Sequence, residues 1–314
     1  MLRGIGLKIG ATFAFALMSA LVKLAAPVFP VSEIVLFRSV FAMATLAAWL
    51  AWRGEWPTAL KTSRPFGHVG RSLAGTGGMF SGFVAVSLLP LADATAFTFA
   101  TPLMVVPLAA LVLGEVVSVA RAAAVAGGFA GVLVMLSGHL GQGARDASSA
   151  LGAAVALTGA GCAAIAMIQT RRLTRSEATG AIVFYFSLVT TLISLAILVV
   201  AALWPERAAL GAVAAGQRFV LPDGLAFLML IGIGVLGGCG QILLTHCYRY
   251  ADASIIAPFD YVAMIWAATL GYLLFAETPT ASVLLGAAVV VSAGVAMLAR
   301  ERQTRRLRPA AQKA

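Results

Sequence analysis

The chain has 314 residues, of which 61% are hydrophobic and only 11% are charged, and its mean hydropathy is +0.97. A soluble domain carries about 25% charged residues, so this chain lacks the polar side chains that a water-exposed surface needs. These figures argue against a soluble enzyme, a nucleic-acid-binding module and a disordered protein. They predict an integral membrane protein, in which the net charge of +10 has meaning only relative to the two sides of a membrane.

Ten apolar segments come close to, or reach, the length of about 20 residues that a helix needs to cross a bilayer. The predicted fold class is therefore all-α integral membrane with ten transmembrane helices. The chain begins with the basic residues Arg3 and Lys8 and an apolar run, as a signal peptide does. We expect a retained helix instead, because the internal repeat described below requires this segment as the partner of helix six. The segments are 5–25, 33–52, 70–90, 94–114, 119–137, 150–170, 179–203, 224–247, 253–276 and 281–299.

The Lys and Arg residues in the loops and near the segment ends are distributed unevenly. With the N-terminus inside, 17 of them, Lys8 and Arg71 included, fall on the inner side and 4 on the outer side. This positive-inside pattern predicts a multi-pass protein of the bacterial-type inner (plasma) membrane with both termini cytoplasmic. The basic residues of 300–314 then contact anionic lipid headgroups rather than nucleic acid.

The chain repeats itself at a long interval. Ala-Asp-Ala-Thr at 92–95 opens one proline-containing apolar segment, and Ala-Asp-Ala-Ser at 251–254 opens another; the two end at Glu115 and Glu277. Five helices per unit is an odd number, so the second unit enters the membrane from the opposite side. Inverted repeats of this kind are typical of carriers that work by alternating access.

The repeat sets the predicted domain boundaries. The first unit covers 1–138 with helices one to five, the second covers 139–299 with helices six to ten, and a basic cytoplasmic tail covers 300–314.

These repeats, together with Pro-Val-Ser-Glu-Ile at 30–34 and Arg38, resemble the EamA family, ten-helix carriers of the drug/metabolite transporter superfamily. The stretch 251–277, with Ala-Pro-Phe-Asp-Tyr at 257–261, is most similar to a subgroup that includes carriers of S-adenosylmethionine and riboflavin. The resemblance implies a central cavity lined by helices one, three, four, six, eight and nine. Family members move amino acids, nucleotide sugars, vitamins and drugs in either direction.

Polar residues at bilayer depth are the first candidates for function. Asp260 lies nine residues into its segment, about 13 Å deep, and Pro258 loosens the helix beside it. We interpret Asp260 as a substrate or proton site, with a structural ion pair as the alternative. Gln241 follows a glycine-rich run and is expected to bind either the substrate or another helix.

Arg38, Glu33 and Lys23 are interpreted as a gating or structural ion-pair group near the outer ends of helices one and two. The spacing from Glu33 to Arg38 is one residue longer than the favoured i,i+4 pair, so Arg38 could also reach the interface.

Four aromatic residues complete the predicted site, namely Phe15, Phe97, Tyr261 and Trp266. They are spread over helices one, four and nine, where they could line a cavity for a planar solute or pack against lipid and neighbouring helices. The pairs Gly78/Gly82 and Gly127/Gly131 fit small-residue helix packing.

The sequence contains no nucleotide-binding loop, no catalytic motif and no metal-spaced cysteine or histidine cluster, so we expect no enzyme activity, cofactor or metal. The predicted function is secondary transport of a small organic metabolite, with uptake of a heteroaromatic compound such as riboflavin or S-adenosylmethionine preferred. Export of amino acids or toxic metabolites is the alternative among transport functions. The alternatives of another class are a membrane-embedded enzyme and a non-transporting assembly protein. Proton coupling and a homodimer remain open.

Overall fold

The computed structural model describes residues 2–113, 119–138, 144–174, 176–203, 219–250 and 257–311, and every regular element in that part of the chain is helical. Each of the ten predicted segments contains helix, with ends that differ by several residues, and two of the segments are interrupted. The elements are α1 (Leu2–Ala25), α2 (Val31–Trp52), η1 (Thr58–Leu60), α3 (Pro65–Leu88), α4 (Leu91–Thr98), α5 (Ala100–Leu113), α6 (Val119–Ser137), α7 (Ala144–Leu173), α8 (Thr179–Leu203), α10 (Gly224–Tyr250), η2 (Ala257–Tyr261), α12 (Val262–Phe275) and α13 (Ala281–Ala311).

The predicted helix 94–114 is divided into two helices at Phe99. The backbone N–H of Phe99 donates to the carbonyls of Ala96 and Phe97, and α4 ends there. Pro102 has no N–H to donate to the carbonyl of Thr98, four residues earlier, so the hydrogen-bond ladder cannot continue through this point. The segment around 253–276 has the same character, because the 3-10 turn η2 precedes α12; residues 251–256, with Asp252, lie outside the described part.

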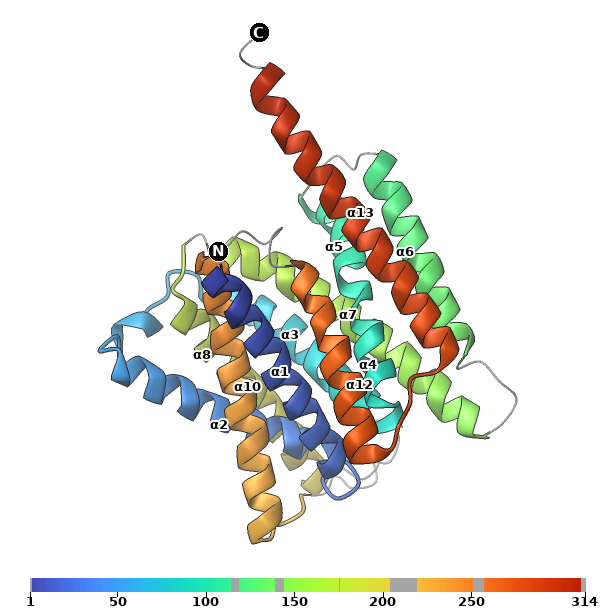
Figure 1. Ribbon diagram of the computed structural model, residues 1–314. Coiled ribbons are helices and arrows are strands. Elements are labelled where there is room, and N and C mark those ends of the chain that lie inside the picture. The colour runs from blue at the N-terminus through green and yellow to red at the C-terminus, as the bar shows by residue number, and fades with distance from the viewer. Residues whose placement is uncertain are drawn as a thin grey trace.

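The pairing of helices follows the inverted repeat. The third helix of the first unit packs on the first helix of the second (α3 on α7), and the reciprocal pair is α1 on α10. Equivalent helices also meet each other, as α2 with α8, α4 with α12 and α6 with α13, and Figure 1 shows the last pair side by side. A pseudo-two-fold axis between two inverted five-helix units requires this pattern, so the predicted fold class is confirmed.

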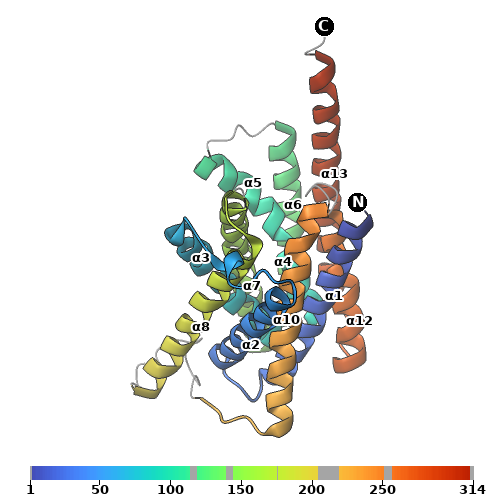
Figure 2. The same cartoon turned by 90° about the vertical axis from the view of Figure 1, so that its left-hand side faces the viewer.

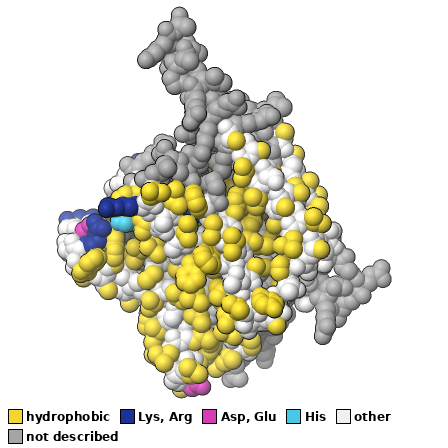
Figure 3. Space-filling model, viewed as in Figure 1, with side chains coloured by type: hydrophobic (Ala, Val, Ile, Leu, Met, Phe, Trp, Pro, Cys, Tyr) yellow, Lys and Arg dark blue, Asp and Glu magenta, His cyan; other side chains and the backbone are white. Residues whose placement is uncertain are grey.

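The surface suits a lipid environment. Six helices are long and apolar enough to cross a membrane, and three shorter apolar helices accompany them within the described residues. Figure 3 shows hydrophobic side chains over most of the described face, with basic side chains gathered at one edge. On α8, for example, Leu192, Leu195 and Val199 are exposed, as expected for a helix that faces hydrocarbon.

The N-terminal end of α1 and the C-terminal end of α13 lie at the same end of the bundle (Figures 1 and 2), as an even number of membrane crossings requires. The predicted basic tail is a continuation of the last helix, since α13 runs on to Ala311. Lys8 and Arg71 differ from the prediction. Both were counted with the inner surface, but they are buried in α1 and α3 and therefore carry no information about orientation.

The α6–α13 contact depends on glycine. A Cβ on Gly131 would lie 2.7 Å from the carbonyl oxygen of Gly286, whereas a Cβ on Gly127 would have no atom within 4 Å. Of the two small-residue positions predicted on this helix, Gly131 therefore makes the close contact within the monomer.

We expect Gly131→Ala to lower the free energy of unfolding by about 1–3 kcal/mol, since the methyl group would push two backbones apart. The matched change Gly127→Ala should be neutral or slightly stabilising, because alanine favours helix more than glycine does. Thermal unfolding in detergent measures both. Equal effects of the two substitutions would contradict the assigned contact.

Glu177 joins two loops near the start of α3. Its carboxylate accepts hydrogen bonds from the Ser63 amide (3.1 Å) and hydroxyl (2.7 Å), and it lies 3.4 Å from His68 Nε2. The Ser63 hydrogen bonds lower the pKa of Glu177 from 4.5 to about 2, because they favour the charged form. The carboxylate thus stabilises the fold only while it is ionised.

Glu177→Gln is expected to lower stability at pH 7 by about 1 kcal/mol, the usual scale for a charge-assisted hydrogen bond near a surface. Because the folded pKa lies below the unfolded one, the native advantage is complete above pH 5 and is lost as the pH falls from about 4.5 towards 2. Melting temperatures at pH 7, 4 and 3 test this, with Glu55→Gln as control. A difference between native and variant that is independent of pH would refute the assignment.

Candidate functional site

The N-terminal end of α1 is linked to the second repeat by an ion pair. Lys8 Nζ lies 2.5 Å from Asp260 Oδ1, and the Lys8 side chain is 3% exposed whereas that of Asp260 is 45% exposed. Asp260 stands in η2, not within a continuous helix as predicted. It therefore forms an ion pair in the structure, which was the alternative reading of this carboxylate, and water can still reach it.

The other end of α1 carries a second ion pair. Lys23 Nζ lies 2.6 Å from Glu277 Oε1 and donates a hydrogen bond to the Leu89 carbonyl at 2.5 Å. Glu277 Oε2 accepts the N–H of Leu91, the first residue of α4. This carboxylate thus caps a helix of the first repeat from the second repeat, and Asp93, the third residue of that helix, is buried.

The two ion pairs lie at opposite ends of the same helix pair. Fifteen residues separate Lys8 from Lys23, which corresponds to about 22 Å along a helix, and Figure 1 shows α1 and α12 running beside each other. Each pair joins α1 of the first repeat to the segment around α12 of the second. Both pairs are closed in this structure.

Glu33 and Arg38 are not joined to each other. Glu33 Oε2 accepts the N–H of Val220 at 2.9 Å, while the guanidinium of Arg38 lies 5.6 Å from the centre of the Phe186 ring. Residues five apart on a helix point about 140° away from each other, which explains why the predicted pair does not form. Lys23, the third member of the predicted group, pairs with Glu277 instead.

A second buried arginine faces the same ring. The guanidinium of Arg71 on α3 lies 4.1 Å from the Phe186 centre, and its Nε donates to Thr170 Oγ1 at 3.2 Å. Arg38 is 3% exposed and Arg71 is 8% exposed. In the described part of the chain, neither arginine has a carboxylate partner, since the ion pairs there join other residues.

Sequence reasoning missed Arg71 and Phe186, although the repeat holds a signal for one of them. Ile-Val-Leu-Phe-Arg-Ser at 34–39 aligns with Ile-Val-Phe-Tyr-Phe-Ser at 182–187, so Arg38 and Phe186 are equivalent residues. Equivalent residues that touch must lie beside the pseudo-two-fold axis. Arg71 was missed because its segment was started at residue 70, which placed it at a helix end rather than inside α3.

Two glycines, one from each repeat, lie beside this contact. A Cβ on Gly237 of α10 would lie 2.9 Å from Arg38 Nε, and a Cβ on Gly75 of α3 would lie 2.9 Å from Phe186 Cε2. Any larger side chain at these positions would displace the arginine or the ring. The glycine-rich runs of the two repeats thus make room for Arg38 and Phe186.

The predicted aromatic residues are distributed over several contacts. Phe97 is completely buried in the core, and Phe15 packs against Gly240, the residue before Gln241, which is itself half-buried on α10. The ring of Tyr261 meets Phe99 at 5.1 Å, and Trp266 meets Phe13 at 5.1 Å, both edge to face. Phe97, Phe15 and Tyr261 thus belong to one hydrophobic cluster, whereas Trp266 packs against Phe13 beside it.

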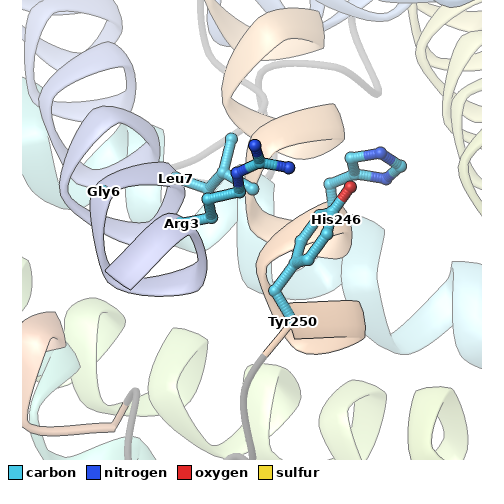
Figure 4. A pocket seen from close by; sticks show the side chains of 5 residues that line it. All are labelled: Arg3, Gly6, Leu7, His246 and Tyr250. Carbon is cyan, nitrogen blue, oxygen red and sulfur yellow. The ribbon is translucent and has the colours of Figure 1, made fainter. Parts of the chain in front are cut away.

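An open hollow of about 320 Å³ lies at the end of the bundle that holds the start of α1. Figure 4 shows that its walls come from the first turns of α1 and the last turns of α10. Leu7, beside Lys8, belongs to its lining. The lining residues are Arg3, Gly6, Leu7, His246 and Tyr250.

Comparison with known proteins identifies the chain. The EamA-like transporter family matches residues 2–137 and 150–300. The pseudopaline exporter CntI of Pseudomonas aeruginosa is 31% identical over 94% of this chain and 95% of its own length. The S-adenosylmethionine uptake transporter of Rickettsia prowazekii is 27% identical over 87% of this chain and 84% of its own length. The riboflavin transporter of Rhizobium johnstonii is 28% identical over 79% of this chain and 75% of its own length.

A solved crystal structure shares the fold, with a TM-score of 0.64, 21% identity and coverage of 97% of this chain and 98% of the other. The family match extends over both halves of the helical bundle. This chain therefore belongs to the EamA-like transporter family and is a membrane transporter rather than an enzyme.

Proposed function

We propose that the protein is a secondary transporter of the inner membrane that moves a small organic metabolite by alternating access, with the two α1 ion pairs as its gates. The observation that carries this proposal is their placement. Lys8–Asp260 and Lys23–Glu277 each join the first repeat to the second, at opposite ends of one helix. A carrier that opens to one side must separate its halves at that end and keep them joined at the other.

The gates have an energetic consequence. Separating either pair costs more than the value of about 1 kcal/mol for an exposed ion pair and less than that of about 3–5 kcal/mol for a fully buried one, because the lysines are mostly buried while the carboxylates are partly exposed. Opening therefore needs a compensating event, such as substrate binding or protonation of the carboxylate. Asp260 is the better candidate for protonation because it is half exposed, whereas Glu277 also caps α4.

For the substrate, we propose uptake of a heteroaromatic metabolite, S-adenosylmethionine or riboflavin, on the similarity to transporters named for these compounds. Export is the second candidate, because the pseudopaline exporter is similar over nearly the whole chain. The positive-inside pattern supports cytoplasmic termini for either direction.

Uptake of radiolabelled S-adenosylmethionine and riboflavin by cells that express the chain tests the proposed substrate. We expect saturable uptake of one compound, at least tenfold above cells that express Lys23→Met, because that change removes one gate and leaves Glu277 unpaired. Protein levels in the membrane are compared by immunoblot. No uptake of either compound by correctly inserted protein would reject these substrates and favour export.

Asp260→Asn tests the proposed proton coupling in vesicles with an imposed pH gradient. Asparagine cannot lose a proton, so we expect accumulation driven by the gradient to fall at least tenfold. Its amide oxygen can still accept a hydrogen bond from Lys8, so exchange of labelled for unlabelled substrate should be retained. Glu55→Gln, an exposed carboxylate paired with Arg53, serves as control and should behave as the native protein. If the Asp260 variant still accumulates substrate against its gradient, Asp260 does not couple protons.

A further inference from the structure

We infer that Arg38 and Arg71, which both face the ring of Phe186, form a binding site for a carboxylate group of the transported molecule. This inference rests on the proposed transport function and narrows its substrate to organic acids and zwitterions that carry a carboxylate, such as amino-acid derivatives.

The geometry brings two cations to one place. The two guanidinium carbons lie 5.6 Å and 4.1 Å from the centre of the same ring, so they are no more than about 10 Å apart. Arg38 Nε and Arg71 Nη1 are buried and have no hydrogen-bond partner among the described residues. Arg71 Nε is held by Thr170, which fixes the guanidinium while leaving its other donors available.

The charges there are not balanced. Two guanidinium groups buried in a membrane protein repel each other and lose hydration, and a cation–π contact with Phe186 returns only about 0.5–2 kcal/mol each. No carboxylate of the described residues pairs with either arginine. A carboxylate supplied by the substrate would offset this repulsion, and the planar fork of arginine matches a carboxylate with two parallel hydrogen bonds.

The surroundings suit a binding site at the interface of the repeats. Buried hydroxyls without a partner among the described residues stand on the same three helices, α2, α3 and α8; they are Ser39, Ser72 and Ser187. One turn beyond Phe186, the hydroxyls of Thr76 and Thr190 are 2.7 Å apart and join α3 to α8. Because Arg38 touches its own repeat equivalent, motion of the repeats changes this site directly.

Thermal unfolding of the purified transporter in detergent tests the inference, with succinate and glutamate as probes against chloride at equal ionic strength. We expect the carboxylates to raise the melting temperature of the native protein by about 2–4 °C, as a ligand of the folded state does. Arg38→Met and Arg71→Met should abolish the rise, whereas Arg53→Met, at an exposed ion pair, should preserve it. No rise in the native protein, or an equal rise in the two variants, overturns the inference.

A purely structural role predicts a different result. If the arginines only stabilise the fold, their removal should lower the melting temperature measured without a probe. If they serve to bind a ligand, that melting temperature should stay equal or rise, because the substitution removes a buried charge that has no carboxylate partner among the described residues. Gly237→Ala keeps both arginines but crowds Arg38, so it should weaken the carboxylate response. Gly82→Ala, where a Cβ has no atom within 4 Å, is its matched control and should leave the response unchanged.

Transport assays separate this inference from the proposed function. If the arginine variants lose the carboxylate response and the native protein carries neither S-adenosylmethionine nor riboflavin, the site stands and the proposed substrates are wrong. If the native protein carries S-adenosylmethionine and Arg38→Met carries it equally well, the transport function stands and the site is wrong.

Discussion

Close contact between the backbones of the two inverted repeats is the constraint on which the rest of this structure depends. In a bilayer, lipid tails are as apolar as leucine, so burial of hydrophobic surface does not by itself drive helices together. Helices associate where small residues let their backbones approach. The α6–α13 pair meets through Gly131 and Gly286, and the α3–α7 pair meets through Gly78 and Gly159.

Two charged side chains also join the repeats across the interface between them. Lys8 and Lys23, on the first repeat, each reach a carboxylate of the second. In the proposed alternating-access transport, these contacts lie between the two halves that move. They hold the closed arrangement, and their positions at the two ends of α1 make them suitable for opening one end at a time.

The two-fold symmetry is broken where Arg38 meets Phe186. Two arginines at this pair of equivalent positions would repel each other, and two phenylalanines would provide no charge. The actual pair gives one cation and one aromatic face, to which α3 adds the second cation of Arg71. The sequence thus departs from its own repeat at the place where a polar solute could be held between the halves.

The amino-acid sequence by itself determined the ten helices, the inverted repeat and the family, because hydropathy and repeated motifs are properties of single segments. It could not determine which polar groups meet. Asp260 pairs with Lys8, Glu33 accepts a hydrogen bond from Val220, and Arg71 faces the ring of Phe186, all between residues more than one hundred positions apart. Such contacts depend on the face that each helix turns towards its neighbours, and only the packing of the whole bundle decides that face.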